Sequence, residues 1–216
     1  MKNLMILALA LFLVACGASP EGEQVEAQDA VEANTPAAAT NSLAVDTDAS
    51  VINWVGAKFT GDQHNGTIQI AEGKLMTEGS NLVGGNFIID MSTIKVTDET
   101  PEEMKAKLVG HLTTGDFFEV EKYGKASFEI TSVEVAQGNP DATHNITGNL
   151  TMKDITKSIT IPATVSITEG GIAAKTPQFV IDRTQWGVTY GSTTAGALKD
   201  KAIKDEIALQ INLATK

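Results

Sequence analysis

The sequence predicts an all-β fold, an eight-stranded antiparallel barrel with a short helical insert between strands three and four. From Ser50 onward, apolar residues mostly recur at every second position, the period of a strand that lies between core and water. About eight such runs are separated by clusters of Gly, Asn, Asp or Thr, whereas one segment near residues 100–112 carries helix signals. A closed barrel is favoured because closure removes exposed sheet edges, and a two-sheet sandwich is the alternative.

The first three strands are predicted near residues 50–60, 64–71 and 81–91, where the alternation is shorter or less regular. The third run is apolar on both sides around Phe87 and Ile89. A strand with two apolar faces needs a cover on each, so we expect the helical insert to lie over this one.

The helical insert begins with start signals at Thr100, Pro101 and Glu103. They predict an N-cap residue, a proline at the first helical position and a capping-box glutamate. Met104 and Leu108 are spaced by four and therefore share one face of the helix. We expect the helix to continue through a turn at residues 116–118.

The remaining five strands follow the insert. Residues 159–168 alternate most clearly, with Ile, Ala and Val at the odd positions and Thr, Pro or Ser at the even ones. The step Lys153-Asp154 predicts a hairpin turn between this run and the preceding one. The five runs lie near residues 125–136, 146–152, 159–168, 171–183 and 207–214.

The first 46 residues are predicted to lie outside the barrel. Lys2 precedes a run of eleven apolar residues, Leu4 to Val14. The run is too short to span a hydrocarbon core of about 30 Å but typical of a secretory signal peptide over residues 1–15. The run ends in Leu13-Val14-Ala15-Cys16, which resembles a bacterial lipobox and implies cleavage before a lipidated Cys16. Residues 16–46 are acidic, lack Lys and Arg and show no period, so we expect a disordered tether before a domain at 47–216.

Composition argues against several classes of function. The chain has 16 basic and 27 acidic residues, and its net charge of −11 disfavours nucleic acid as a partner. One cysteine cannot form an internal disulfide, and the three histidines show no metal-binding spacing, so we expect neither a metal nor a cofactor. No nucleophile elbow, phosphate loop or H-E-x-x-H motif occurs, so we expect a protein that is not an enzyme.

Four stretches in order resemble the YceI-like family of bacterial polyisoprenoid-binding proteins. They are the block Gly110–Tyr123 with its GHL and DFF motifs, the hairpin at 146–162, the segment Phe179–Gly191 and the final strand from Asp205. The earlier spacing of Trp54, Lys58, His64 and Gly66 fits as well, so the resemblance covers residues 50 to 213. This chain departs from the family only at two turn positions, Gly124 and Asp154.

The resemblance implies a lipocalin-like barrel whose apolar pocket holds an isoprenoid or a similar long-chain amphiphile without a covalent bond. Together with the lipobox, it implies a protein of the bacterial cell envelope, periplasmic or associated with the outer membrane, that contacts the membrane through lipidated Cys16. A second copy of the chain, in a homodimer, is a further candidate partner. The alternative functions are a structural or stress-response lipoprotein that sequesters hydrophobic compounds, or an unrecognised barrel enzyme.

A cavity is also suggested by the residues themselves, because aromatic side chains are few and inward positions carry small residues such as Gly148 and Ala163. Strand parity places the ligand tail inside the barrel, and its head near the helix within reach of His111 or Arg183. Arg183 is the sole arginine, and an ion pair that closes one barrel end is its alternative role. The candidate ligand-binding residues are Trp54, Phe87, Ile89, His111, Phe117, Phe128, Leu150, Met152, Ile161, Arg183 and Trp186.

Overall fold

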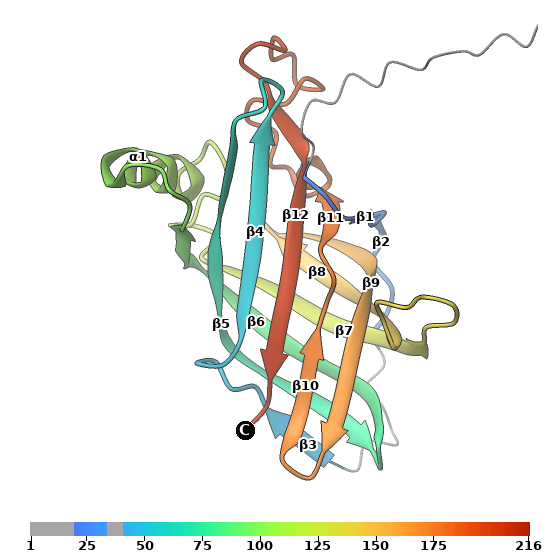
Figure 1. Cartoon of the computed structure of the whole chain (residues 1–216). Coiled ribbons are helices and arrows are strands. Elements are labelled where there is room, and N and C mark those ends of the chain that lie inside the picture. Colours follow the sequence, from blue (N-terminus) through green and yellow to red (C-terminus); the bar gives the residue numbers. More distant parts are fainter. Residues whose placement is uncertain (1–19, 34–40) are drawn as a thin grey trace, which may run out of the picture.

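The computed structural model describes residues 20–33 and 41–216 and contains a closed barrel (Figure 1). Each strand pairs antiparallel with the next, and the last strand pairs back with the first, which confirms the predicted eight-stranded architecture. The ring consists of β4 (Val51–Lys58), β5 (Gln63–Glu78), β6 (Asn81–Val96), β7 (Lys125–Val135), β8 (His144–Met152), β9 (Ile155–Thr168), β10 (Gly171–Lys175) and β12 (Ile203–Ala214).

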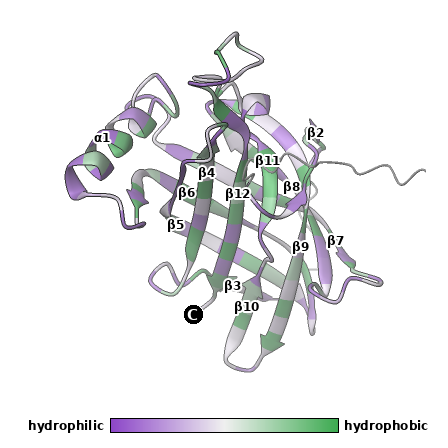
Figure 2. Cartoon of the chain, turned by 45° about the horizontal axis from the view of Figure 1, so that its top comes forward, coloured by the Kyte–Doolittle hydropathy of each residue, from purple (hydrophilic) through white to green (hydrophobic). Residues whose placement is uncertain are grey.

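The seventh ring position is shared by two short strands. β10 pairs with both β9 and β12 at one end of the barrel, and β11 (Phe179–Asp182) pairs with β12 nearer the other end. A 3₁₀-helix, η1 (Arg183–Trp186), follows β11 directly. Along the strands of Figure 2, hydrophobic and hydrophilic residues alternate, as expected for a sheet with one face toward the core.

The predicted hairpin at Lys153-Asp154 is confirmed. Met152 pairs with Ile155, and the two residues between them have positive φ values of 47° and 60°. Two left-handed residues in succession form the type I′ turn whose twist matches the flanking strands, and Asp tolerates this conformation better than most residues.

The helical insert is α1 (Glu102–Thr113), and it connects β6 to β7 as predicted. The expected capping box is wrong, because the N-cap is Pro101 and no side chain caps the helix. Thr100 is engaged elsewhere, since its hydroxyl lies 3.4 Å from His64 Nδ1 and its backbone N–H donates to Asp98 Oδ1 at 2.9 Å. Only Leu112 of α1 is fully buried, so the helix forms a cover at one end of the barrel. No helix in the described part of the chain is long and apolar enough to cross a membrane.

The prediction of a disordered tether over residues 16–46 is wrong for residues 20–33 and 41–46. β1 (Glu23–Gln24) pairs parallel with β11, β2 (Gln28–Asp29) pairs with β9, and β3 (Asn41–Ala44) pairs with β5. Val25 between β1 and β2 is 6% exposed, and its N–H donates to Val180 O at 2.8 Å. The signal peptide, the lipobox and Cys16 lie outside the described residues.

The physical reason for this order is an incomplete neighbouring strand. β10 pairs only with residues 164–168 of β9, which leaves the first half of β9 without a partner on that side. Unpaired backbone groups at a sheet edge favour the addition of another strand. β1 and β2 lie between β11 and β9 and provide this additional pairing. The polar segment 23–29 is therefore ordered by backbone hydrogen bonds on both sides of the buried Val25.

Candidate ligand cavity

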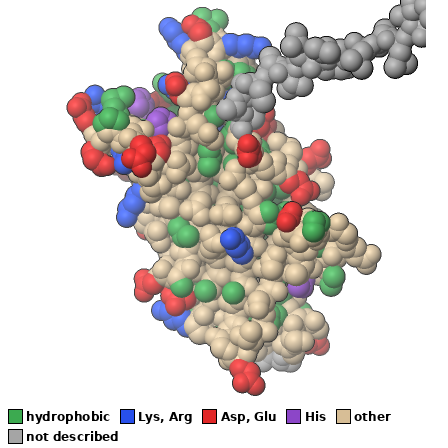
Figure 3. All heavy atoms as spheres, viewed as in Figure 1, with side chains coloured by type: hydrophobic (Ala, Val, Ile, Leu, Met, Phe, Trp, Pro, Cys, Tyr) green, Lys and Arg blue, Asp and Glu red, His purple; other side chains and the backbone are tan. Residues whose placement is uncertain are grey.

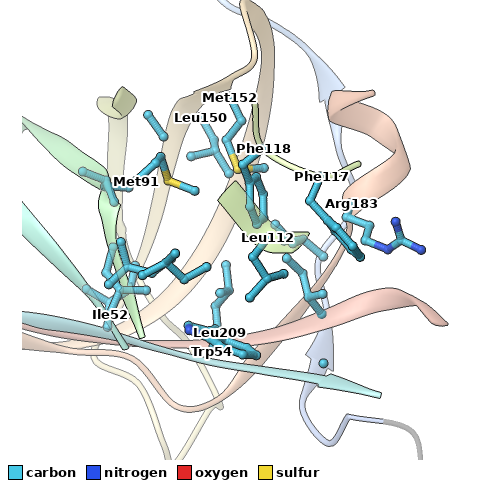
Figure 4. A pocket seen from close by; sticks show the side chains of 18 of the residues that line it. Ile52, Trp54, Met91, Leu112, Phe117, Phe118, Leu150, Met152, Arg183 and Leu209 are labelled. Carbon is cyan, nitrogen blue, oxygen red and sulfur yellow. The ribbon is translucent and has the colours of Figure 1, made fainter. Parts of the chain in front are cut away.

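A cavity of about 1250 Å³, counting the part open to solvent, lies inside the barrel beneath α1 and the segment that follows it. Side chains from β4, β5, β6, β7, β8, β9, β11 and β12 line it, together with Leu108 of α1. Leu112, Phe117 and Phe118 cover one end (Figure 4). Nearly all lining residues are apolar. The polar or charged ones are Lys58, Asp62, His64 and Arg183.

Strand parity explains the lining. The predicted inward faces of β8, β9 and β12 contribute Leu150 and Met152, Ile159 and Ile161, and Ile207, Leu209 and Ile211. Their neighbours in the sequence point outward, as the hydrogen bond between the hydroxyls of Thr147 and Thr160 across β8 and β9 illustrates. The alternation alone therefore decides which half of each strand faces the cavity.

All but two of the predicted site residues line this cavity. They are Trp54, Phe87, Ile89, Phe117, Phe128, Leu150, Met152, Ile161 and Arg183. His111 does not, because it lies in the last turn of α1, is 57% exposed and binds Asp116 Oδ2 through Nδ1 at 2.9 Å. Trp186 does not either, because it is fully buried in η1 and its Nε1 donates to Leu150 O at 2.9 Å. Trp186 supports the wall from behind.

Several lining residues were not among the predicted ones. Lys58, Asp62 and His64 lie at the β4–β5 hairpin, and Phe118 lies in a turn where strand parity gives no information. Strand parity also predicts His64 as a lining residue. Trp54 faces inward and pairs with Gly66, and His64 lies two residues before Gly66, on the same face of β5.

Phe87 and Phe128 are paired residues of the adjacent strands β6 and β7, and their inward rings stack with centroids 5.4 Å apart. Below them lies a second, smaller cavity of about 460 Å³ that shares these two residues, Ile161 and Ile211 with the first. Gly148 lies against the Phe128 ring so closely that a Cβ there would be 2.4 Å from a ring carbon. We call the cavity beneath α1 the upper cavity and the second the lower cavity; the Phe87–Phe128 stack lies where they meet, because both rings line both cavities.

Arg183 is held by the protein itself. Its Nε donates to Lys204 O at 3.1 Å, its Nη1 to Val188 O at 2.7 Å, and its Nη2 lies 3.4 Å from both Ile203 O and Asp205 Oδ1. Burial lowers the pKa of the guanidinium, and the nearby Asp205 carboxylate opposes this shift. In Figure 4 the guanidinium points away from the other labelled side chains. The guanidinium is thus bonded to backbone carbonyl groups and paired with Asp205, and its central carbon lies 5.7 Å from the centroid of the Phe117 ring.

His64 belongs to a polar corner formed with Asp98 and Thr100. His64 Nδ1 lies 2.9 Å from Asp98 Oδ2, and the N–H groups of Asn65 and Thr100 donate to the same carboxylate at 3.3 and 2.9 Å. Burial raises the pKa of Asp98, but hydrogen bonds from Thr100, His64 and Asn65 outweigh it and hold that pKa well below its usual range. Asp98 is therefore a carboxylate that faces His64 Nδ1, and the Thr100 hydroxyl lies 3.4 Å from the same nitrogen.

The three histidines do not converge. His64 binds Asp98, His111 binds Asp116, and His144 lies 2.8 Å from the Thr143 hydroxyl. Within residues 20–33 and 41–216, no three His, Cys, Asp or Glu side chains are grouped so that they could hold a metal ion.

A sequence model of the YceI-like domain matches residues 43–215, from β3 to the end of β12. Similar curated proteins are a UPF0312 protein of Ectopseudomonas mendocina, 32% identical over 98 residues, and one of Pseudomonas putida, 30% identical over 100 residues. These alignments cover 45% and 46% of this chain and 47% and 48% of the relatives. The chain therefore spans about half the length of the curated relatives it matches.

Two solved structures share the fold. Burkholderia cenocepacia BcnA aligns with a TM-score of 0.63 at 19% identity, over 80% of this chain and 99% of BcnA. A polyisoprenoid binding domain from Saccharophagus degradans, implicated in plant cell wall breakdown, aligns with a TM-score of 0.57 at 15% identity, over 80% and 97% of the two chains. At such identities the likeness concerns the fold.

Proposed function

This chain belongs to the YceI-like domain family, and on that premise we propose that its barrel binds the apolar chain of an isoprenoid or a similar long-chain amphiphile without a covalent bond. The observation that supports the proposal is the upper cavity, whose walls are apolar except for Lys58, Asp62, His64 and Arg183 at its rim. A concave site of this kind selects a ligand by apolar burial and orients it by a few polar groups. The relative from Saccharophagus degradans is named for polyisoprenoid binding.

The expected behaviour is exchange of the ligand with a membrane. Burial from water contributes about 0.8 kcal/mol per methylene, but an isoprenoid normally resides in a bilayer that is as apolar as the cavity. Relative to that bilayer, the barrel gains little per carbon atom. Ligand transfer in both directions is therefore favoured over permanent retention, and the protein serves as a carrier or a store.

We also propose that Cys16 anchors the barrel to a membrane of the bacterial envelope, where exchange takes place. A lipid anchor raises the effective concentration of the barrel at the bilayer without any new contact. The test is Cys16→Ala followed by cell fractionation. A variant that leaves the membrane fraction agrees with the proposal, and one that remains membrane-bound to the same extent contradicts it.

Binding itself is tested by native mass spectrometry of the purified protein, first for copurified lipid and then after addition of a polyprenol. We expect Ile89→Trp, which enlarges a lining side chain, to weaken polyprenol binding. The matched control is Ile155→Trp, since Ile155 lies outside the cavity and is 37% exposed. Equal binding by both variants would move the site out of the barrel. A wild-type protein that binds no polyprenol would favour the structural alternative.

A further inference from the structure

Four inward positions on neighbouring strands form a small square at the rim of the upper cavity. Trp54 and Gly56 lie on β4, and they pair with Gly66 and His64 of β5, respectively. Residues two apart share a face, so Trp54 and His64 are diagonal neighbours with a glycine at each remaining corner. Trp54, Gly56 and His64 all line the cavity.

The two glycines have different surroundings. A Cβ at Gly66 would lie 2.7 Å from two ring carbons of Trp54, so the indole covers Gly66. A Cβ at Gly56 would meet nothing within 4 Å. The space over Gly56 is therefore an open recess of the cavity, next to Trp54 on the same strand and to His64 directly across on β5. Figure 4 shows the Trp54 indole beside Leu209 at the edge of the cavity.

The two neighbours of the recess differ in burial: Trp54 is 9% exposed, and the His64 side chain is 32% exposed. Trp54 Nε1 is, within residues 20–33 and 41–216, the only buried side-chain nitrogen or oxygen that lacks a hydrogen bond. His64 Nδ1 lies 2.9 Å from Asp98 Oδ2, and in a neutral imidazole whose Nδ1–H donates to that carboxylate, Nε2 is an acceptor. A buried donor without an acceptor is unfavourable and is normally explained by a missing partner. A hydroxyl group offers both complementary functions, because its oxygen accepts from an indole N–H and its hydrogen can be donated to an imidazole nitrogen.

The charges nearby disfavour an anionic group. Lys58 Nζ lies 3.5 Å from Asp62 Oδ2, and Arg183 is held by Asp205 and three carbonyl groups, so both cations at the rim already have partners. The Asp98 carboxylate lies behind His64, and Figure 3 shows acidic side chains over α1, whose first turn contains Glu102 and Glu103. A phosphate at the recess would be repelled by carboxylates without gaining a free cation.

We infer that the recess over Gly56 receives the uncharged hydroxyl end of the ligand, so that the preferred class is a free prenol and not a prenyl phosphate or diphosphate. This inference rests on the proposed function, because the prenyl chain must occupy the barrel. It assigns the head group to His64 and Trp54 and leaves His111 and the Arg183 guanidinium outside the site.

The test compares three probes that share one prenyl chain and carry a hydroxyl, a methyl ether or a monophosphate. We expect the wild-type protein to bind the alcohol about tenfold more tightly than the ether, the factor expected for one hydrogen bond, and to bind the phosphate no better than the ether. Equal affinities for all three probes, or tightest binding of the phosphate, would overturn the inference. Failure of every probe would instead reject the proposed function.

Two variants locate the effect. His64→Ala should remove the preference for the alcohol over the ether, while His111→Ala, which alters a histidine with the same 2.9 Å carboxylate contact outside the cavity, should keep it. Gly56→Leu fills the recess from a position with open space and leaves the His64–Asp98 pair intact, so it should also remove the preference. Retention of the preference in a folded Gly56→Leu protein, as judged by circular dichroism, would place the head group elsewhere.

Discussion

The upper and lower cavities are built from the same alternating strands, yet they differ in size and in polarity. The upper cavity is closed by α1 and the Phe117–Phe118 turn, whereas strand side chains such as Leu75, Leu82 and Leu213 fill the lower end. The upper cavity has four charged or ionisable residues at its rim, and the lower one has Thr176 as its sole polar lining residue. Alternation thus creates an inward face, but side-chain size and the covering segment decide whether the space stays open.

The Phe87–Phe128 stack lies where the two cavities meet, and removing one of its rings should have the largest effect. Phe128→Ala is expected to lower the free energy of unfolding by about 3–5 kcal/mol, because a large buried side chain is replaced by a void. It should also join the two cavities and allow longer prenyl chains to bind. Urea unfolding and a chain-length series in native mass spectrometry measure the two effects.

The control for this substitution is Phe59→Ala, because Phe59 is 38% exposed and lies outside both cavities. We expect its cost to be below about 1 kcal/mol. If Phe128→Ala left the longest bound chain unchanged, the stack would not be the barrier between the two cavities.

Narrowing the interior should have the next largest effect. A Leu at Gly148 would displace the Phe128 ring, and Ala163→Phe would fill the lower cavity, each at a cost of about 1–3 kcal/mol from overpacking. Both variants should bind long polyprenols less well than short ones. Gly110→Leu is the control, since a Cβ at Gly110 on α1 meets nothing within 4 Å. Unchanged binding of long chains by both folded variants would mean that the tail does not enter the lower cavity.

The two tryptophans provide a finer comparison. Trp186→Phe removes a donor to Leu150 O and should destabilise the protein by about 1–2 kcal/mol. Trp54→Phe removes an N–H that has no acceptor, so without ligand it should cost less than Trp186→Phe. Thermal unfolding of the two variants, freed of lipid, measures the difference. A larger loss for Trp54→Phe would show that Trp54 Nε1 has an acceptor in the free protein.

The smallest expected effect is a pH dependence from the polar corner of the upper cavity. The pKa of Asp98 lies below its value of 3.8 in an unfolded chain, so the folded protein binds this proton less readily. Its contribution to stability is therefore complete above about pH 4 and is lost as the pH falls below that value. Urea unfolding between about pH 2 and pH 6 should show a shallower decline for Asp98→Asn than for the wild-type protein. Parallel curves would contradict the assignment.

The sequence by itself determined the barrel, the place of the helix and most of the cavity wall. Period-two alternation is a local property, and it placed Leu150, Met152 and Ile161 inward before any contact was known. The turn at Lys153-Asp154 was equally local. These features need only the geometry of a strand and the chemistry of a turn.

What only the tertiary structure decided depends on contacts between distant segments. Composition predicted a disordered tether, but residues 23–29 are ordered because β10 ends early and leaves an edge of β9 unpaired. His111 and Trp186 belong to helical turns, where strand parity does not apply, so one projects into solvent and the other packs behind the wall. The His64–Asp98 pair joins residues 34 positions apart. The closed sheet decides which residues far apart in the sequence pair and how their side chains are oriented. A pattern of neighbouring residues in the sequence carries no information on this.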